Sequence, residues 1–118
     1  MSNVVKEKSF AFAVRVVNVY KYLCADKKEY VLSKQLLRSG TAIGALVREA
    51  EQAESKPDFI HKMAIALKEA NETEYWILLL HRTEYLSTNE AESLMANITE
   101  LLKLLTSIIT TSKQRMAK

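Results

Sequence analysis

The chain has 118 residues and a formal net charge of +3, and it contains two glycines, one proline and one cysteine. Average usage would place about 14 glycines and prolines in this length, so strand-and-turn folds lack the residues that their turns require. The composition therefore excludes all-β and α/β folds and predicts an all-α protein. The length fits a single domain over residues 1–118. The lone Cys24 cannot form an internal disulfide.

The sequence shows no pattern typical of a membrane span or an export signal. Its longest uninterrupted apolar run, Tyr75 to Leu80, is far shorter than the roughly 20 residues that cross a bilayer. Lys6, Glu7 and Lys8 lie where a signal peptide needs apolar residues. We therefore expect a soluble, cytoplasmic protein with no membrane partner.

The first two helices are predicted over about residues 4–24 and 30–53, separated by a polar, charged segment. Apolar residues recur at helical spacing in both. The stripe of the first is Phe10, Val14, Val17 and Cys24, and the stripe of the second is Leu32, Leu36, Ile43, Val47 and Ala50. Gly40 and Gly44 lie nearer the core side of the second helix, where a missing side chain lets another backbone approach closely.

The third and fourth helices are predicted over about residues 56–85 and 88–112. Ser55 is a suitable N-cap, and Pro57 fits the first turn because early N–H groups have no helical partner. Ser87 and Glu90 have capping-box spacing. The fourth stripe is Ala91, Leu94, Met95, Ile98, Leu101, Leu102, Leu105, Ile108 and Ile109. Short connections force neighbouring helices to be antiparallel, so we predict an up-down-up-down four-helix bundle.

Two of these helices carry more apolar surface than one bundle can bury, because a helix packed on one core needs a stripe of only about 100°. The first helix adds Phe12, Val16, Val19 and Leu23 outside its stripe. On the third helix the expected core residues are Phe59, Ile60, Met63, Leu67, Ala70, Ile77 and Leu78, and the nearly opposite face holds Ile65, Trp76 and Leu80, together with Glu69. Such residues are either isolated exposed side chains, which are normal on any surface, or an interface between copies of the chain.

The second helix offers a surface that would suit such an interface. Arg38, Ala42, Ala45 and Glu49 follow its outward side at near-helical spacing, and two alanines admit close approach of another helix. The predicted homo-oligomer interface is therefore Arg38, Ala42, Ala45, Glu49, Ile65, Glu69, Trp76 and Leu80. Arg38 and Glu49 could equally be plain solvated charges.

The residues give little support for catalysis. A di-metal site in a four-helix bundle needs two Glu-x-x-His pairs, whereas this chain offers a single Asp-x-x-His, from Asp58 to His61. We find neither a glycine-rich phosphate loop nor a nucleophile with a matching base. We therefore expect a non-enzymatic protein without a metal or cofactor.

Positive charge lies near both ends of the chain. Lys6 and Lys8 lie near its start, and Lys113, Arg115 and Lys118 near its end. In the predicted topology these residues converge, because the first helix starts where the fourth ends. In a ring of copies they would form a cationic rim that binds RNA or DNA through phosphates, with strong salt dependence. A frayed, solvated tail explains the same charges equally well.

Three stretches carry a resemblance to a known family. QLLRSGTAIGALVREA at 35–50, SKPDFI at 55–60 and ALKEANETEYW at 66–76 resemble the bacterial four-helix bundle proteins encoded in 23S rRNA intervening sequences. The similarity covers nearly the whole chain. By that likeness Arg38, Glu49, Glu69 and Trp76 occupy the family's signature positions. Two residues depart from the pattern: Leu46 stands where asparagine is common, and Arg48 where a small residue is usual.

The resemblance implies a homopentameric bundle of unsettled molecular function. Its retroelement accessory relatives form basic barrels that bind nucleic acid and a reverse transcriptase. The expected function is therefore a nucleic-acid-binding or ribonucleoprotein accessory, with a reverse transcriptase-like protein as a further partner by resemblance. The alternative is a protein-protein scaffold in which Ile65, Trp76 and Leu80 recruit a different partner.

Overall fold

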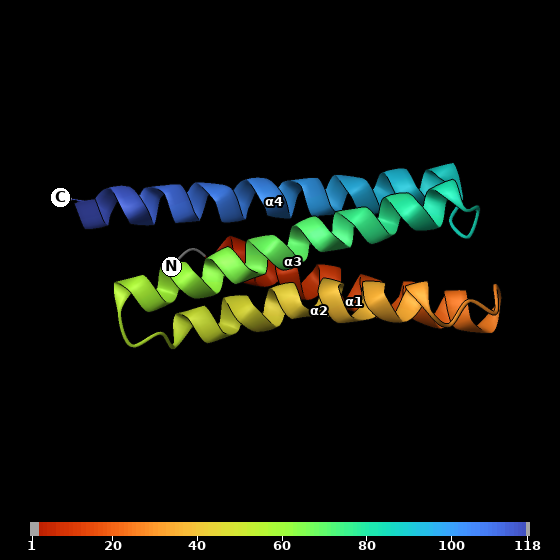
Figure 1. Cartoon of the computed structure of the whole chain (residues 1–118), viewed down its shortest axis with the longest axis horizontal. Coiled ribbons are helices and arrows are strands. Elements are labelled where there is room, and N and C mark those ends of the chain that lie inside the picture. Colours follow the sequence, from red (N-terminus) through yellow and green to blue (C-terminus); the bar gives the residue numbers. More distant parts are fainter. Residues whose placement is uncertain (1–2, 118) are drawn as a thin grey trace.

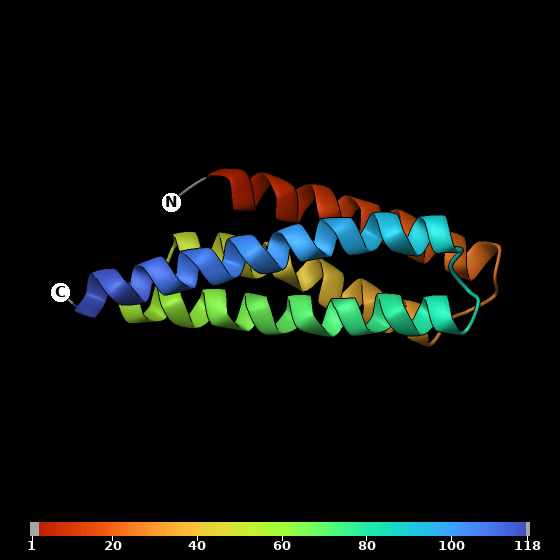
Figure 2. The same cartoon turned by 90° about the horizontal axis from the view of Figure 1, so that it is seen from above.

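The computed structural model describes residues 3–117, which form four α-helices. These are α1 (Asn3–Ala25), α2 (Leu32–Glu51), α3 (Lys56–Arg82) and α4 (Thr88–Ala117). Each helix runs antiparallel to the one before it, and all four lie side by side in an elongated bundle (Figures 1 and 2) that measures 51 × 21 × 20 Å. The predicted all-α fold with four helices is confirmed.

The helix boundaries lie within three residues of the predicted ones, except at the end of α4. This helix continues to Ala117 instead of ending near residue 112. Helix α3 ends at Arg82 rather than 85. Glu84 shortly after it adopts a φ of 69°, and Lys28 after α1 adopts a φ of 54°, a left-handed conformation in which helices commonly terminate.

The starts of α3 and α4 are capped as the sequence predicts. Ser55 Oγ accepts a hydrogen bond from the Asp58 N–H at 3.2 Å. Before α4 the Ser87 N–H donates to Glu90 Oε1 at 2.9 Å, and the Glu90 N–H donates to Ser87 Oγ at 3.1 Å. Each pair satisfies N–H groups that have no partner inside the helix.

The start of α2 depends on a carboxylate that sequence reasoning missed. Glu29 is only 8% exposed, and its carboxylate accepts hydrogen bonds from the N–H groups of Val31 (3.1 Å), Leu32 (2.8 Å) and Ser33 (2.7 Å). Burial raises the pKa of Glu29, but these hydrogen bonds outweigh it and hold the pKa below its ordinary value of 4.5. The charged form of Glu29 therefore stabilises the turn between α1 and α2.

The core is one apolar cluster to which all four helices contribute. The predicted apolar stripes of α4 and α2 both face this core. The buried residues of the α4 stripe are Ala91, Leu94, Ile98, Leu101, Leu105 and Ile109. Those of the α2 stripe are Leu36, Ile43, Val47 and Ala50. The expected stripe of α1 is wrong. Phe10 and Val14 are 55% and 48% exposed, whereas Phe12 and Val16 are buried. On α3, Leu78 was also expected inside but is 50% exposed.

The two glycines of α2 explain which side of α1 faces inward. A Cβ at Gly40 would lie 2.9 Å from both methyl groups of Val16, and one at Gly44 would lie 3.3 Å from the backbone oxygen of Ser9. The helices therefore approach each other too closely for a side chain at Gly40. This contact directs Val16 inward and leaves Phe10 and Val14 on the outside.

Helix α4 alone, among the helices of residues 3–117, is long and apolar enough by composition to cross a membrane. Its apolar side packs into the core through residues such as Leu94, Ile98 and Leu105. On another side Glu100 forms an ion pair with Lys8 of α1 at 3.1 Å. Packing in the bundle therefore accounts for part of the apolar composition of α4, of whose most apolar window 28% is buried.

A test of the α1–α2 contact is the substitution Gly40→Leu. We expect it to lower the free energy of unfolding by about 2 kcal/mol, because the new side chain would overpack against the stiff, β-branched Val16. Lys34→Leu, at an exposed position of the same helix, should change it by no more than about 0.5 kcal/mol. Urea unfolding measures both variants against the wild type. A Gly40→Leu variant as stable as the wild type would contradict the close contact between α1 and α2.

Glu29 predicts a pH dependence of stability. Because its folded pKa is lowered, its contribution is present above the unfolded pKa and is lost as pH falls through the folded pKa. Glu29→Gln should cost about 1–2 kcal/mol of unfolding free energy at neutral pH. The difference between variant and wild type should shrink as pH falls below 4.5. A difference that is constant across this range in thermal or urea unfolding would refute the assignment.

Candidate functional site

The outer surface along α2 and α3 brings most of the predicted interface residues together. We call this surface the α2–α3 strip; it comprises Arg38, Ala42, Ala45 and Glu49 of α2 and Lys62, Ile65, Glu69, Glu72 and Trp76 of α3. Cross-helix contacts at both ends define it: Arg38 reaches Glu69 and Glu72, and Lys62 reaches Glu49 at 3.4 Å. Ala45 between these ends is exposed, and Ala42 and Ile65 are half-buried.

Arg38 links α2 to α3 within the chain. Its Nη1 and Nη2 each donate to a carboxylate oxygen of Glu69 at 3.2 Å, and Nη2 also pairs with Glu72. The hydrogen bonds to Glu69 raise the pKa of Arg38 above its ordinary value, although burial acts in the opposite direction. Because the Arg38 side chain is 52% exposed, solvent screens these pairs and they orient the helices more than they stabilise them.

Trp76 contains the polar atom of the strip that lacks a partner. Its half-buried ring packs against the core and meets Tyr75 edge-on, with ring centroids 5.1 Å apart. Its Nε1 is buried and makes no hydrogen bond in the described part of the chain. Among residues 3–117 every other buried side-chain nitrogen or oxygen has a hydrogen-bond partner. An unpaired buried donor costs about 1–3 kcal/mol, so a nearby acceptor would stabilise this site.

Leu80 was wrongly placed on the strip, because it is fully buried in the core. Its four-residue spacing from Trp76 suggested a common outer face. The core side of α3, however, consists of two rows with seven-residue spacing, Met63, Ala70 and Ile77 in one and Ala66, Thr73 and Leu80 in the other. Leu80 continues the second row, which is the packing expected of a bundle helix.

A buried polar contact beneath the strip also escaped sequence reasoning. The hydroxyl oxygens of Ser39 and Thr73 lie 2.9 Å apart, and Thr73 Oγ1 is 2.8 Å from the backbone oxygen of Glu69. Both side chains are fully buried. They satisfy each other across the α2–α3 contact, so this polar pair is structural rather than available for a ligand.

The cations predicted to converge do not all reach one site. Helix α1 begins and α4 ends at the same end of the bundle (Figures 1 and 2). Lys6, however, forms an ion pair with Glu51 at 3.1 Å, and Lys8 pairs with Glu100. Lys118 lies outside the described residues. In the described part of the chain, Lys113 and Arg115 form no ion pair.

A cleft opens at this end of the bundle, which we call the end cleft. It has a volume of about 710 Å³ and lies between the last turns of α4 and the corner where α2 meets α3. Its lining is Ala50, Glu51, Ala53, Ser55, Lys56, Phe59, Ser107, Ile108, Thr111, Ser112 and Arg115. Helix α4 has 30 residues and α1 has 23, so α4 is about 10 Å longer, and no residue of α1 lines the cleft.

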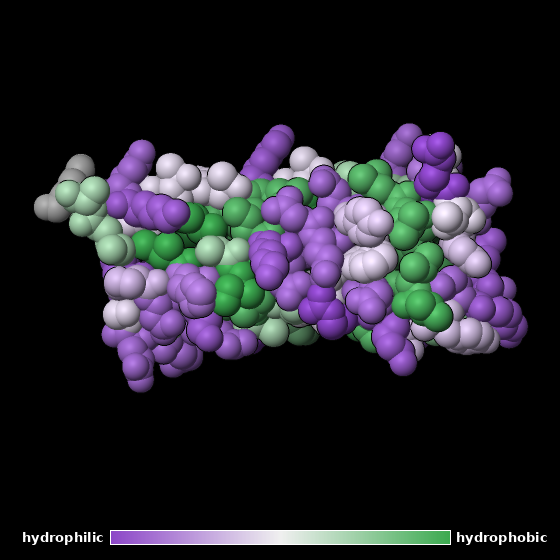
Figure 3. Space-filling model, viewed as in Figure 1, coloured by the Kyte–Doolittle hydropathy of each residue, from purple (hydrophilic) through white to green (hydrophobic). Residues whose placement is uncertain are grey.

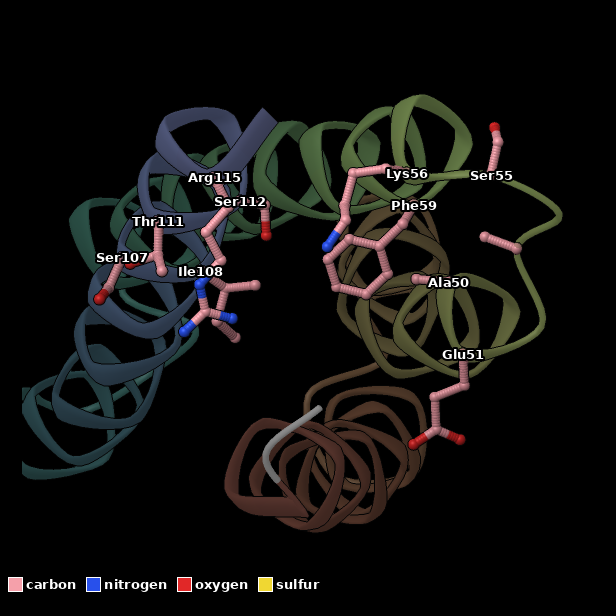
Figure 4. Close-up of a pocket in the computed structure, with 11 residues that line it drawn as sticks. Ala50, Glu51, Ser55, Lys56, Phe59, Ser107, Ile108, Thr111, Ser112 and Arg115 are labelled. Atoms are coloured by element: carbon pink, nitrogen blue, oxygen red, sulfur yellow. The ribbon is translucent and has the colours of Figure 1, made fainter. Parts of the chain in front are cut away.

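Lys56 and Arg115 extend into the end cleft from opposite sides (Figure 4). The ring of Phe59 lies beside Lys56 and the side chain of Ile108 lies beside Arg115, so each wall of the cleft carries a cation and an apolar side chain. Glu51 points away from the cleft in the same view, and its carboxylate is already paired with Lys6. The cleft therefore combines two cations, which form no ion pair in the described residues, with an apolar lining.

A second, more apolar hollow lies beside the cleft, between α3 and α4. It has a volume of about 380 Å³ and is lined by Pro57, Ile60, His61, Ala64, Lys113 and Met116. On the face of the molecule seen in Figure 3, apolar side chains gather toward both ends and hydrophilic ones lie between them. Because Lys113 lines this hollow together with Pro57 at the start of α3, it lies at the same end of the bundle as Arg115 and Lys56.

The described residues show no cluster suited to metal-dependent catalysis. Across residues 3–117 no three His, Cys, Asp or Glu side chains come together as a metal site would require. Asp58 instead helps to begin α3, where its carboxylate lies 3.4 Å from the backbone nitrogen of Glu54.

The model of the 23S rRNA-intervening sequence protein family matches residues 1–107. The chain belongs to this family. The match spans all four helices, although it ends before the last turns of α4 that line the end cleft. No curated protein shows significant similarity to the chain.

A solved structure agrees with membership of the 23S rRNA-intervening sequence protein family. It is a protein of unknown function from the S23 ribosomal protein family of Bacteroides thetaiotaomicron, with 63% sequence identity and a TM-score of 0.88. The match covers 89% of this chain and 97% of that one. The recognised family and the helical fold are therefore confirmed, while the role of the family stays uncharacterised.

Proposed function

We propose that the chain is a non-enzymatic accessory protein that binds RNA or DNA through its phosphates at the end of the bundle that contains the end cleft. The observation that carries this proposal is the set of cations there. Lys56, Lys113 and Arg115 come from two helices, and in the described residues none of them has an acidic partner. Solvated cations of this kind neutralise phosphates with little competition from the protein's own carboxylates.

The paired lysines contribute less than the sequence suggests. Lys6 and Lys8 would have to leave Glu51 and Glu100 before they could bind phosphates fully. The residues proposed to contact phosphates therefore lie on α3 and α4 rather than on α1. With few cations per copy and no element shaped to enter a groove, such binding would be weak, salt-dependent and without base specificity.

Self-association is the second part of the proposal. The α2–α3 strip combines an exposed alanine, a half-buried isoleucine and the buried Trp76 N–H, which lacks an acceptor. A second copy placed on the strip would remove its apolar atoms from water. Repetition of the cationic end around a ring would raise its affinity for a polyanion. The number of copies, five, comes from the family resemblance.

A protein-protein scaffold is the second candidate function, and exposed apolar side chains on α1 favour it. Phe10 and Val14 are about half exposed. The guanidinium carbon of Arg48 lies 5.4 Å from the centroid of the Phe10 ring, which is a cation–π contact. In this alternative a protein partner would cover these side chains, and nucleic acid would not bind.

The nucleic-acid proposal is tested by titrating labelled single-stranded and double-stranded RNA and DNA at low and high salt. Replacing Lys113 and Arg115 together by Gln should weaken binding by about tenfold or more at low salt. The slope of the logarithm of the binding constant against the logarithm of salt concentration should become shallower by about two, one for each lost phosphate contact. Replacing Lys21 and Lys34 together by Gln removes the same charge from exposed positions toward the opposite end and should change much less. Absence of binding even at low salt would leave the scaffold as the better account.

Self-association through the strip is tested by Trp76→Glu and Ala45→Glu. A charge placed in a desolvated interface has no compensating partner, so each variant should remain helical but have a smaller mass by light scattering. Ala45 is exposed, so that variant keeps the test valid if Trp76→Glu disturbs the core. Asn71→Glu, on the other side of α3, is the control. Unchanged masses for all three variants would exclude the strip as the interface.

A further inference from the structure

We propose that the end cleft is a subsite for one unpaired nucleotide, with the base against the apolar lining and its phosphate between Lys56 and Arg115. This inference rests on the proposed nucleic-acid binding and specifies the form of nucleic acid. Single strands and unpaired overhangs fit the subsite, and fully paired duplex does not.

The size of the cleft fits a small ligand. Its volume of about 710 Å³ lies within the range of about 300–1,000 Å³ that is usual for small-molecule pockets. A base within a duplex is stacked and paired, and it reaches a pocket only after it is flipped out at an energetic cost. An unpaired nucleotide enters without that cost.

The charges of the cleft suit a phosphate. Lys56 at the start of α3 and Arg115 in the last turns of α4 project into the cleft from two sides (Figure 4). Arginine can bind two phosphate oxygens at once, and lysine adds a point charge. Glu51 is the acidic residue of the lining, and its side chain turns outward to Lys6. Within the described residues no carboxylate therefore opposes an anion in the cleft.

The apolar lining beside the two cations suits a base. Phe59 is half-buried and packs against the core, so its ring is held in place before a ligand arrives. Ile108 and Ala50 line the same space. Bases stack on aromatic side chains with little regard to sequence, and nearby hydroxyls such as that of Ser112 can bond to sugar or base edges. An ion on a flat basic surface would need no such apolar lining.

The test compares a short single-stranded RNA with a blunt duplex of the same sequence, using fluorescence anisotropy at low salt. The single strand should bind more tightly, and adenosine monophosphate should displace it where the same concentration of inorganic phosphate does not. Phe59→Leu keeps an apolar side chain but removes the aromatic ring, so it should weaken single-strand binding by about fivefold or more. Tyr30→Leu makes the same kind of change at an exposed position between α1 and α2, at the opposite end of the bundle, and should have no effect.

Ser112→Phe is a second variant that fills the cleft without removing a core side chain, and it should weaken single-strand binding as Phe59→Leu does. Circular dichroism establishes that each variant is folded. Equal binding of single strand and duplex, or single-strand binding insensitive to both cleft variants, would overturn the subsite while the phosphate-binding proposal stands. If neither the single strand nor the duplex binds the wild-type protein, both proposals are overturned.

Discussion

The close packing of α2 between α1 and α3 is the constraint on which the rest of the structure depends. On one side Gly40 leaves no room for a side chain beside Val16. On the other, the buried hydroxyls of Ser39 and Thr73 meet directly. A glycine on one side and two small side chains that hydrogen-bond to each other on the other side thus let α2 contact both neighbours closely. The resulting rotation of α1 buries Phe12 and leaves Phe10 outside.

Helix α4 is held differently, and this difference produces the candidate site. It packs mainly on α3 and makes few contacts with α1, and it is the longest of the four helices described. Its last buried apolar residue is Ile109, among the residues described. The turns beyond that residue carry Arg115, which lines the end cleft, and Lys113, which lines the neighbouring hollow. A packing mismatch at one end of the bundle thus places cations beside an apolar space.

Local signals in the sequence predicted the fold well, whereas contacts between helices decided much of the site. Ser55 and the Ser87–Glu90 pair cap helices through neighbours three residues away, so their pattern is readable without a fold. Helix α1 is apolar on both sides, and periodicity alone could not choose between Phe10 and Phe12. The partners of Lys6 and Lys8 lie on α2 and α4. No spacing rule along the chain reveals them, and the end cleft likewise is formed by residues 50–59 and 107–115, which are distant in sequence.

The central claim is that nucleic acid binds where α4 extends past the other helices. Methyl NMR of the intact protein, labelled at Ile and Met and titrated with short single-stranded RNA, tests it most directly. The account predicts shift changes at Ile108 and Met116, which line the two hollows at this end, and none at Ile43 in the core. Shift changes centred on Ile65 of the α2–α3 strip, with Ile108 and Met116 unaffected, would contradict it.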